Sequence, residues 1–191
     1  MPSYVKNVVT VQHKDPKEIL RAMDGEDGAF DFNNLVPMPD ELKGIQCVHD
    51  GADDVFYRLE DLEDAQDNDL AFGGLPGDFP LPKVPTKEWL QHNKLDAFTV
   101  KRLIKDYGAV YWYEWCIHNW GTKWPASEVK HSVIGDRIVF SFFTAWDPPF
   151  PVIRKFFEFA KGKSANVRWQ YEYEGGFPDD QIHTIEKLEE I

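Results

Sequence analysis

A pair of strands joined by a two-residue turn, in the last third of the chain, restricts the fold more than any other segment. Residues 128–134 and 137–144 flank Gly135-Asp136, a dipeptide suited to a tight hairpin. The second strand is apolar on both faces, with Ile138, Phe140 and Phe142 on one face and Val139 and Phe143 on the other. Strands of this kind are typical of the centre of a sheet. The pattern therefore predicts an antiparallel hairpin whose second strand lies inside a larger sheet.

Four more segments supply the other parts of a layered structure of sheet and helices. Residues 5–11 and 167–173 alternate apolar with polar side chains, which predicts two further strands. Asp15-Pro16 begins a helix, with the aspartate as its cap and the proline at the first helical position. Pro151 opens a second helix, whose apolar residues recur at helical spacing. Without residues of about 28–125, the order is β-α-β-β-α-β, which predicts an α+β, ferredoxin-like sandwich with a four-stranded antiparallel sheet.

In that topology the first and third strands are central. Residues 5–11 should therefore pair with residues 137–144 on one side and residues 167–173 on the other. We expect residues of about 28–125, which this topology does not need, to form a long, largely helical and acidic insertion after the first helix. A length of 191 residues fits one well-packed domain, so we expect a single domain over residues 1–191.

Three shorter segments carry predictions of their own. Apolar residues on one face of residues 99–107 predict a helix that Gly108 interrupts. Residues 30–39 contain two prolines and predict an extended segment whose apolar side chains line the sheet edge. Apolar residues at 182, 185 and 188 have helical spacing, which predicts a terminal helix.

The composition argues against several classes of function. A net charge of −12 disfavours direct binding to nucleic acid, which needs clustered Lys and Arg. No apolar run approaches the ~20 residues of a membrane helix, and the first residues lack the plan of a signal peptide. Cys47 and Cys116 have no CxxC spacing. We therefore expect a cytoplasmic protein with no cofactor and no membrane partner.

Two tryptophan-containing segments, residues 114–125 and 144–149, predict either a binding site or a structural cluster. As a site they would form a pocket with tryptophan walls, polar hydrogen-bonding groups and a lysine that contacts an anion. The candidate pocket residues are Asn119, Trp120, Thr122, Lys123, Trp124, Thr144 and Trp146. In the alternative, the tryptophans cap the open end of the core, Asn119 pairs with buried backbone groups and Gly121 permits a turn.

Residues 50–70 form a strongly acidic stretch, with nine acidic side chains against Arg58 alone. Such a surface can imitate nucleic-acid phosphates and occupy a basic groove on a partner protein. The candidate residues are Asp53, Asp54, Glu60, Asp61, Glu63 and Asp64. The alternative is an amphipathic helix with a solvated, charged outer face.

No catalytic or metal-binding signature is present in the sequence. Its six histidines include no HxxxH or HxH pair, and there is no GxSxG, P-loop or dinucleotide motif. A hydrolase could use Glu172, Glu174 and Asp147 if they lay within about 5–10 Å of one another. On an alternating strand such carboxylates are also typical of a solvated face. We therefore expect no catalytic residues and no metal.

Six short segments, spread in order over nearly the whole chain, carry a resemblance to a known family. They are residues 1–7 (MPSYVKN), 30–33 (FDFN), 36–42 (VPMPDEL), 119–124 (NWGTKW), 144–149 (TAWDPP) and 169–174 (WQYEYE). These segments resemble the YubB-type ferredoxin-like family of small phage and plasmid proteins. The acidic and proline-rich residues 50–85 and the end after Glu174 depart from the family pattern. The resemblance implies an origin in a mobile element without a settled activity.

These observations lead to two expectations about function. The first is a non-enzymatic phage or plasmid accessory protein whose acidic surface binds a basic surface on a host protein, with antagonism of host defence as one outcome. The second is a module that binds a small ligand, a nucleotide or a nucleic acid through the tryptophan-lined pocket.

Overall fold

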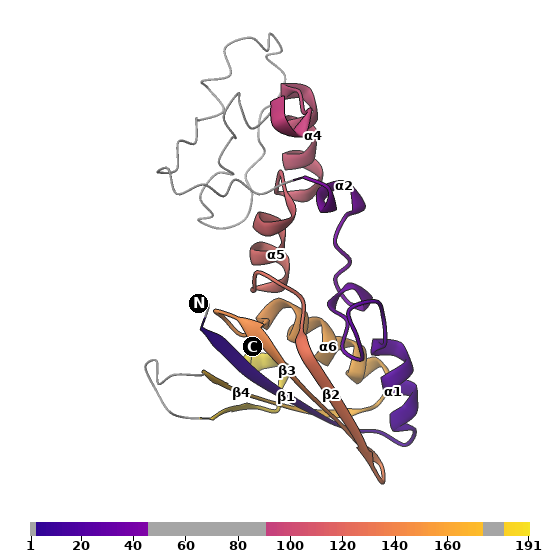
Figure 1. Cartoon of the computed structure of the whole chain (residues 1–191). Helices are drawn as coiled ribbons and strands as arrows, with labels where there is room; N and C mark the ends of the chain where they lie inside the picture. The colour runs from indigo at the N-terminus through magenta and orange to yellow at the C-terminus, as the bar shows by residue number, and fades with distance from the viewer. Residues whose placement is uncertain (1–2, 46–90, 174–181) are drawn as a thin grey trace. The chain divides into compact units, whose positions relative to one another are not determined.

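The computed structural model describes residues 3–45, 91–173 and 182–191 (Figure 1). The chain forms two compact units. The first, here called the sheet unit, comprises Met1–Met38 and Cys116–Ile191; the second, the insertion unit, comprises Pro39–Trp115. The insertion unit thus lies within the predicted insertion of residues 28–125 and is shorter than it at both ends.

The sheet unit is built on one antiparallel sheet of five strands in the order β2-β3-β1-β4-β5. The strands are β1 (Tyr4–Gln12), β2 (Ser127–Ile134), β3 (Arg137–Ala145), β4 (Asn166–Tyr173) and β5 (His183–Ile185). β1 lies between β3 and β4, with Val9 opposite Phe140 on one side and Trp169 on the other, as predicted. The prediction of four strands was wrong, because β5 pairs with the outer edge of β4.

The predicted hairpin is confirmed. β2 and β3 are joined through Gly135, which adopts a φ of +61° that glycine tolerates and other residues rarely adopt. In β3 the side chains of Ile138, Phe140 and Phe142 are fully buried, whereas Val139 and Phe143 on the other face are half-buried. The two faces of this central strand are therefore covered to different extents.

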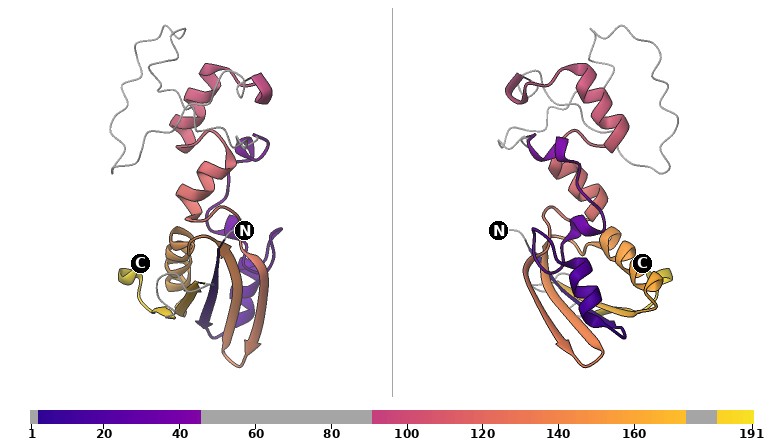
Figure 2. Two further views of the ribbon diagram at one scale, coloured as in Figure 1. Left: turned by 60° about the vertical axis from the view of Figure 1, so that its left-hand side comes forward. Right: turned by 90° about the vertical axis from the view of Figure 1, so that its right-hand side faces the viewer.

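The covered face of the sheet is packed against two helices, α1 (Pro16–Met23) and α6 (Phe150–Gly162), which lie on the same side of it (Figure 2). The carboxylate of Asp15 caps α1 by accepting a hydrogen bond from the Lys17 N–H at 3.1 Å, as its sequence predicts. α6 buries five side chains against the sheet, namely Val152, Ile153, Phe156, Phe157 and Ala160. No described helix of the sheet unit covers the opposite side, here called the uncovered face.

The prediction of a terminal helix was wrong. The residues concerned form β5 and a short 3-10 turn, Leu188–Glu190. Ile185 is opposite Trp169 of β4 and is buried, whereas Ile182 remains 60% exposed. Burial of Ile185 and pairing with the edge of β4 therefore outweigh the helical spacing of the apolar residues.

Within residues 30–39, Phe30 and Phe32 lie in the core, not along the sheet edge as predicted. The ring of Phe30 stacks on Phe142, with centroids 4.8 Å apart and planes at 18°, and both side chains are fully buried. Phe32 begins the 3-10 turn η1 (Phe32–Asn34), which the carboxylate of Asp31 caps through the Asn33 N–H at 2.8 Å. Phe30 therefore packs between the sheet and Phe156 of α6, and Phe32 packs between Phe142 of the sheet and Trp120 at the end of α5.

The insertion unit is helical in its described residues. Its described helices include α2 (Asp40–Lys43), α4 (Ala97–Tyr107) and the first residues of α5 (Trp112–Trp120). α4 confirms the predicted helix, and Gly108 ends it at a φ of +69°. An ion pair of 2.8 Å joins Arg102 of α4 to Glu41 of α2. Among the described helices, none has the length and apolar character needed to cross a membrane.

Candidate functional site

The uncovered face presents every second residue of each strand, because side chains of a strand alternate between its two faces. On β1 these are Tyr4, Lys6, Val8, Thr10 and Gln12. Their neighbours on β3 and β4 are Arg137, Val139, Ser141, Phe143, Asn166, Arg168, Gln170 and Glu172. β2 adds Lys130, Ser132 and Ile134. The face is therefore a mixed surface of polar, aromatic and charged side chains.

The charge of the uncovered face differs from that of the whole chain. Its strands carry four cations, Lys6, Lys130, Arg137 and Arg168, against the carboxylate of Glu172 and that of Glu186, which follows β5 and pairs with Arg168. The described residues of the sheet unit hold 13 Lys and Arg against 14 Asp and Glu, although the whole chain has a net charge of −12. The acidity that disfavours anionic ligands is therefore concentrated elsewhere in the sequence.

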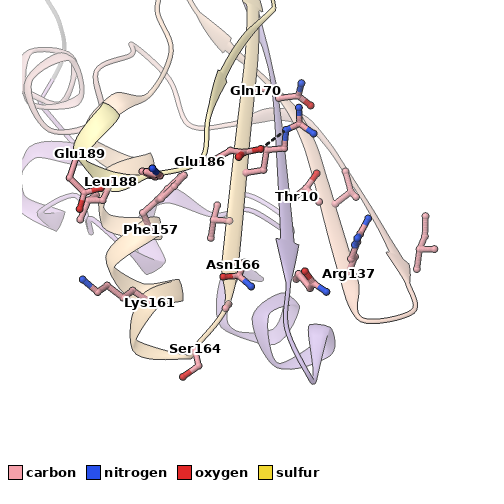
Figure 3. A pocket seen from close by; sticks show the side chains of 17 residues that line it. Thr10, Arg137, Phe157, Lys161, Ser164, Asn166, Gln170, Glu186, Leu188 and Glu189 are labelled. Atoms are coloured by element: carbon pink, nitrogen blue, oxygen red, sulfur yellow. Dashed lines mark ion pairs between the residues drawn. The ribbon is translucent and has the colours of Figure 1, made fainter.

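One end of the uncovered face, here called the basic end, is formed by Arg137 and Arg168. A hollow of about 1160 Å³ lies there and extends to α6 and the C-terminal turn, with Arg137 and Lys161 among its lining residues (Figure 3). Arg168 forms an ion pair of 3.4 Å with Glu186, which partly offsets its charge. Lys187 adds a further cation and Glu189 a further anion to the lining. The hollow is thus open and polar, with more cations than anions.

The other end, here called the aromatic end, contains Tyr4 and Phe143 on the face itself. Their rings meet edge to face, with centroids 6.5 Å apart. Trp146 follows the last residue of β3, and Trp124 precedes the start of β2, so both belong to the same end of the sheet. The two residues are 38% and 39% exposed, which is high for a residue type that is mostly buried on average.

Lys123 lies between the two exposed tryptophans. Its ammonium nitrogen is 4.5 Å from the ring centroid of Trp124 and 5.2 Å from that of Trp146, within the range of cation–π attraction. Trp146 has a φ of +71°, and its backbone N–H donates to the Ser3 carbonyl at 2.8 Å. A positive φ is a strained conformation for a bulky residue. Three predicted pocket residues are therefore brought together, and one of them is held under strain.

The other predicted pocket residues lie deeper. Trp120 is fully buried, and its indole N–H donates to the Val36 carbonyl at 2.8 Å. The Thr122 hydroxyl donates to the Ala145 carbonyl at 2.8 Å and is also buried. Asn119 is half-buried on α5. These contacts match the alternative in which this segment caps the core.

Thr144 belongs to a buried polar network that the sequence analysis missed. Its hydroxyl donates to the Asp147 carbonyl at 2.9 Å and accepts from the Asn7 amide at 3.0 Å. The Asn7 side-chain oxygen in turn accepts from the indole N–H of Trp169 at 3.1 Å. The sequence did contain a signal for this network. Asn7 lies between Val5 and Val9 at a position that the strand alternation assigns to the core, where its amide needs hydrogen-bonding partners.

Two of the three carboxylates of the hydrolase hypothesis, Glu172 and Asp147, belong to the described residues. Glu172 lies on the uncovered face opposite Lys6 of β1. Burial and, secondly, the Asp147 carboxylate raise the pKa of Tyr173. Glu174 lies outside the described residues.

Metal and thiol chemistry receive no support from the described part of the chain. Within residues 3–45, 91–173 and 182–191, no three His, Cys, Asp or Glu side chains are grouped so that they could hold a metal ion. Cys116 is buried, and burial raises the pKa of its thiol to about 12, so the thiol stays protonated at neutral pH. The acidic candidates Asp53, Asp54, Glu60, Asp61, Glu63 and Asp64 lie outside the described residues.

Comparison of the chain with protein-family models, with curated proteins and with solved structures finds no significant match.

Proposed function

We propose that this chain is a non-enzymatic binding protein with a ferredoxin-like sandwich, and that the uncovered face of its sheet receives an anionic ligand. The strand order β2-β3-β1-β4 and the two helices on one face support the fold assignment, with β5 as an added edge strand. In such a sandwich the side without helices is the natural place for a broad binding surface.

The observation that carries this proposal is the group of four cations on the uncovered face, Lys6, Lys130, Arg137 and Arg168. On a chain with a net charge of −12, a face with more cations than anions creates a local potential that attracts anions. Attraction between exposed charges is screened beyond about 8 Å at physiological ionic strength, so binding should weaken as salt is added.

Binding to a panel of labelled polyanions tests the proposal. Fluorescence anisotropy would measure heparin, polyphosphate and an oligonucleotide against the wild-type chain and the variant Lys6→Glu/Arg137→Glu. A matched control is Lys17→Glu/Arg154→Glu, which changes the net charge equally at exposed positions near the starts of α1 and α6, where helices tolerate acidic residues. We expect weaker binding by the first variant only; equal loss in both would assign the effect to net charge alone.

A second candidate function rests on the nine acidic residues at positions 50–70. In that proposal the chain is a phage or plasmid accessory protein, in keeping with its resemblance to the YubB-type family, and binds a basic surface of a host protein. A pull-down from host lysate at low and high salt tests it, with Asp53, Asp54, Glu60, Asp61, Glu63 and Asp64 changed to Asn or Gln in a control bait. A partner that the neutralised bait retains equally well would remove this candidate.

A further inference from the structure

We propose that the anionic ligand is a single-stranded nucleic acid whose bases stack at the aromatic end of the uncovered face and whose phosphates contact its cations. The inference rests on the proposed function and names the class of ligand for the same face. It depends on three observations, concerning the aromatic residues, the backbone strain at Trp146 and the spacing of the cations.

The aromatic residues are the first observation. Tyr4 and Phe143 belong to the two central strands and are half-buried on the uncovered face. The tryptophans of the core, Trp120 and Trp169, are fully buried, so Trp124 and Trp146 with their exposed rings are not needed to fill it. Aromatic side chains on an open sheet stack on the bases of single strands, which is a general mode of nucleic-acid recognition.

Backbone strain is the second observation. Trp146 is the only tryptophan of the described residues with a positive φ, +71°. Strained residues persist where the surroundings hold them, and they concentrate at ligand-binding sites. Here the hydrogen bond to Ser3 and the contact with the Lys123 ammonium keep a half-exposed indole in place beside the sheet. The ring is thus preorganised before a ligand arrives.

The spacing of cations and rings is the third observation. Lys6 is opposite Phe143 in the sheet, and Arg168 is opposite Thr10, so cations occur along the whole length of β1. A strand rises about 3.3 Å per residue, so the eight steps from Tyr4 to Gln12 span about 26 Å. That length accommodates several nucleotides, with bases at the aromatic end and phosphates continuing toward the basic end. A duplex hides its bases and would use the cations alone.

The test compares a fluorescein-labelled oligothymidine of about 12 nucleotides, within the range of site sizes of single-strand-binding domains, with a duplex of equal length and with heparin. The full chain carries Tyr4→Ser and Trp146→Gly, the second of which removes an indole and relieves the positive φ. Phe98→Ala is the control, because Phe98 is 78% exposed on α4 and outside the sheet unit. We expect the Tyr4→Ser/Trp146→Gly variant to bind oligothymidine at least about tenfold more weakly than the wild-type chain and to bind heparin with unchanged affinity. The Phe98→Ala control should bind both ligands as the wild-type chain does. Oligothymidine should also quench the tryptophan fluorescence of the wild-type chain.

Four results would overturn the inference. Equal binding of duplex and oligothymidine, or an unaffected Tyr4→Ser/Trp146→Gly variant, would leave an anion-binding face without base stacking, and the proposed function would stand. Tighter binding of a polyglutamate peptide than of oligothymidine would replace the nucleic acid with an acidic protein. Failure of every polyanion to bind would remove the inference and the proposed function together.

Discussion

Among the described glycines of the sheet unit that have a positive φ, Gly121 is the one whose substitution by alanine should destabilise the unit most. Gly121 ends α5 at a φ of +76°, and a Cβ atom there would lie 2.9 Å from Cδ of Pro151. Gly135 in the β2–β3 turn has a similar φ of +61°, but a Cβ atom there would meet nothing within 4 Å. The two positions therefore share the conformational cost and differ in the steric one.

The magnitudes follow from these two terms. A left-handed backbone costs a residue with a Cβ about 1–2 kcal/mol, and the lower entropy of alanine in the unfolded chain offsets roughly 0.4–1 kcal/mol of that cost. Gly135→Ala should therefore lose about 1 kcal/mol. Crowding against the Pro151 ring should add about 1–3 kcal/mol, so Gly121→Ala should lose about 2–4 kcal/mol.

Equilibrium unfolding in urea, followed by the fluorescence of the buried Trp120 and Trp169, measures both variants. The difference between the two free energies of unfolding isolates the contact with Pro151. Should Gly121→Ala lose no more stability than Gly135→Ala, the close approach between the end of α5 and the start of α6 would be absent in solution. Steric contact with Pro151 would then not explain why glycine occupies the turn that leads to Lys123 and Trp124.

Three further predictions concern buried and capping groups. Asn7→Val should lose about 1–3 kcal/mol, seen as a lower urea midpoint, because a buried indole N–H of β4 loses its acceptor; an unchanged midpoint would contradict this. The hydrogen bond from the Thr99 N–H lowers the pKa of Asp96, so this cap stabilises α4 above the ordinary aspartate pKa and its effect fades as pH falls through the lowered value. Circular dichroism should show a loss of helix below pH ~4 that Asp96→Asn lacks; equal acid loss in both would exclude this role. In a Cys47→Ser chain, Cys116 should resist iodoacetamide at neutral pH until urea unfolds the protein; native labelling measured by mass spectrometry would contradict its burial.

Local signals predicted the elements whose structure depends on nearby residues. The Asp15-Pro16 start of α1, the Gly135 turn and the Gly108 end of α4 all depend on backbone preferences within a few residues. The central position of β1 was predicted from the order of strands and helices along the chain, because the ferredoxin-like topology places its first strand inside the sheet. These features needed no knowledge of which surfaces meet in the folded chain.

Features that depend on distant surfaces were missed. Phe30 stacks on Phe142, more than one hundred residues away, and nothing local to residues 30–39 indicates that partner. Ile185 became part of a strand because the edge of β4 was available to it. For the candidate site, the sequence analysis placed Lys123, Trp124 and Trp146 in one candidate pocket, and the three residues are in contact in the structure. It did not identify Lys6, Arg137 and Arg168 as site residues. Their common face becomes visible only once both helices are known to cover the other one.

The hydrogen bonds of Asn7 have a consequence for how this chain tolerates its insertion. Asn7 bridges Thr144 and Trp169, which are 137 and 162 positions away in the sequence and belong to the two strands on either side of β1. Sliding either neighbour by two residues would leave an amide, a hydroxyl or an indole without a partner in an apolar interior, at a cost that a purely aliphatic interior would not impose. The alignment of the three central strands is thus specified inside the sheet itself, so the intervening segment is free to change in length and charge without disturbing it.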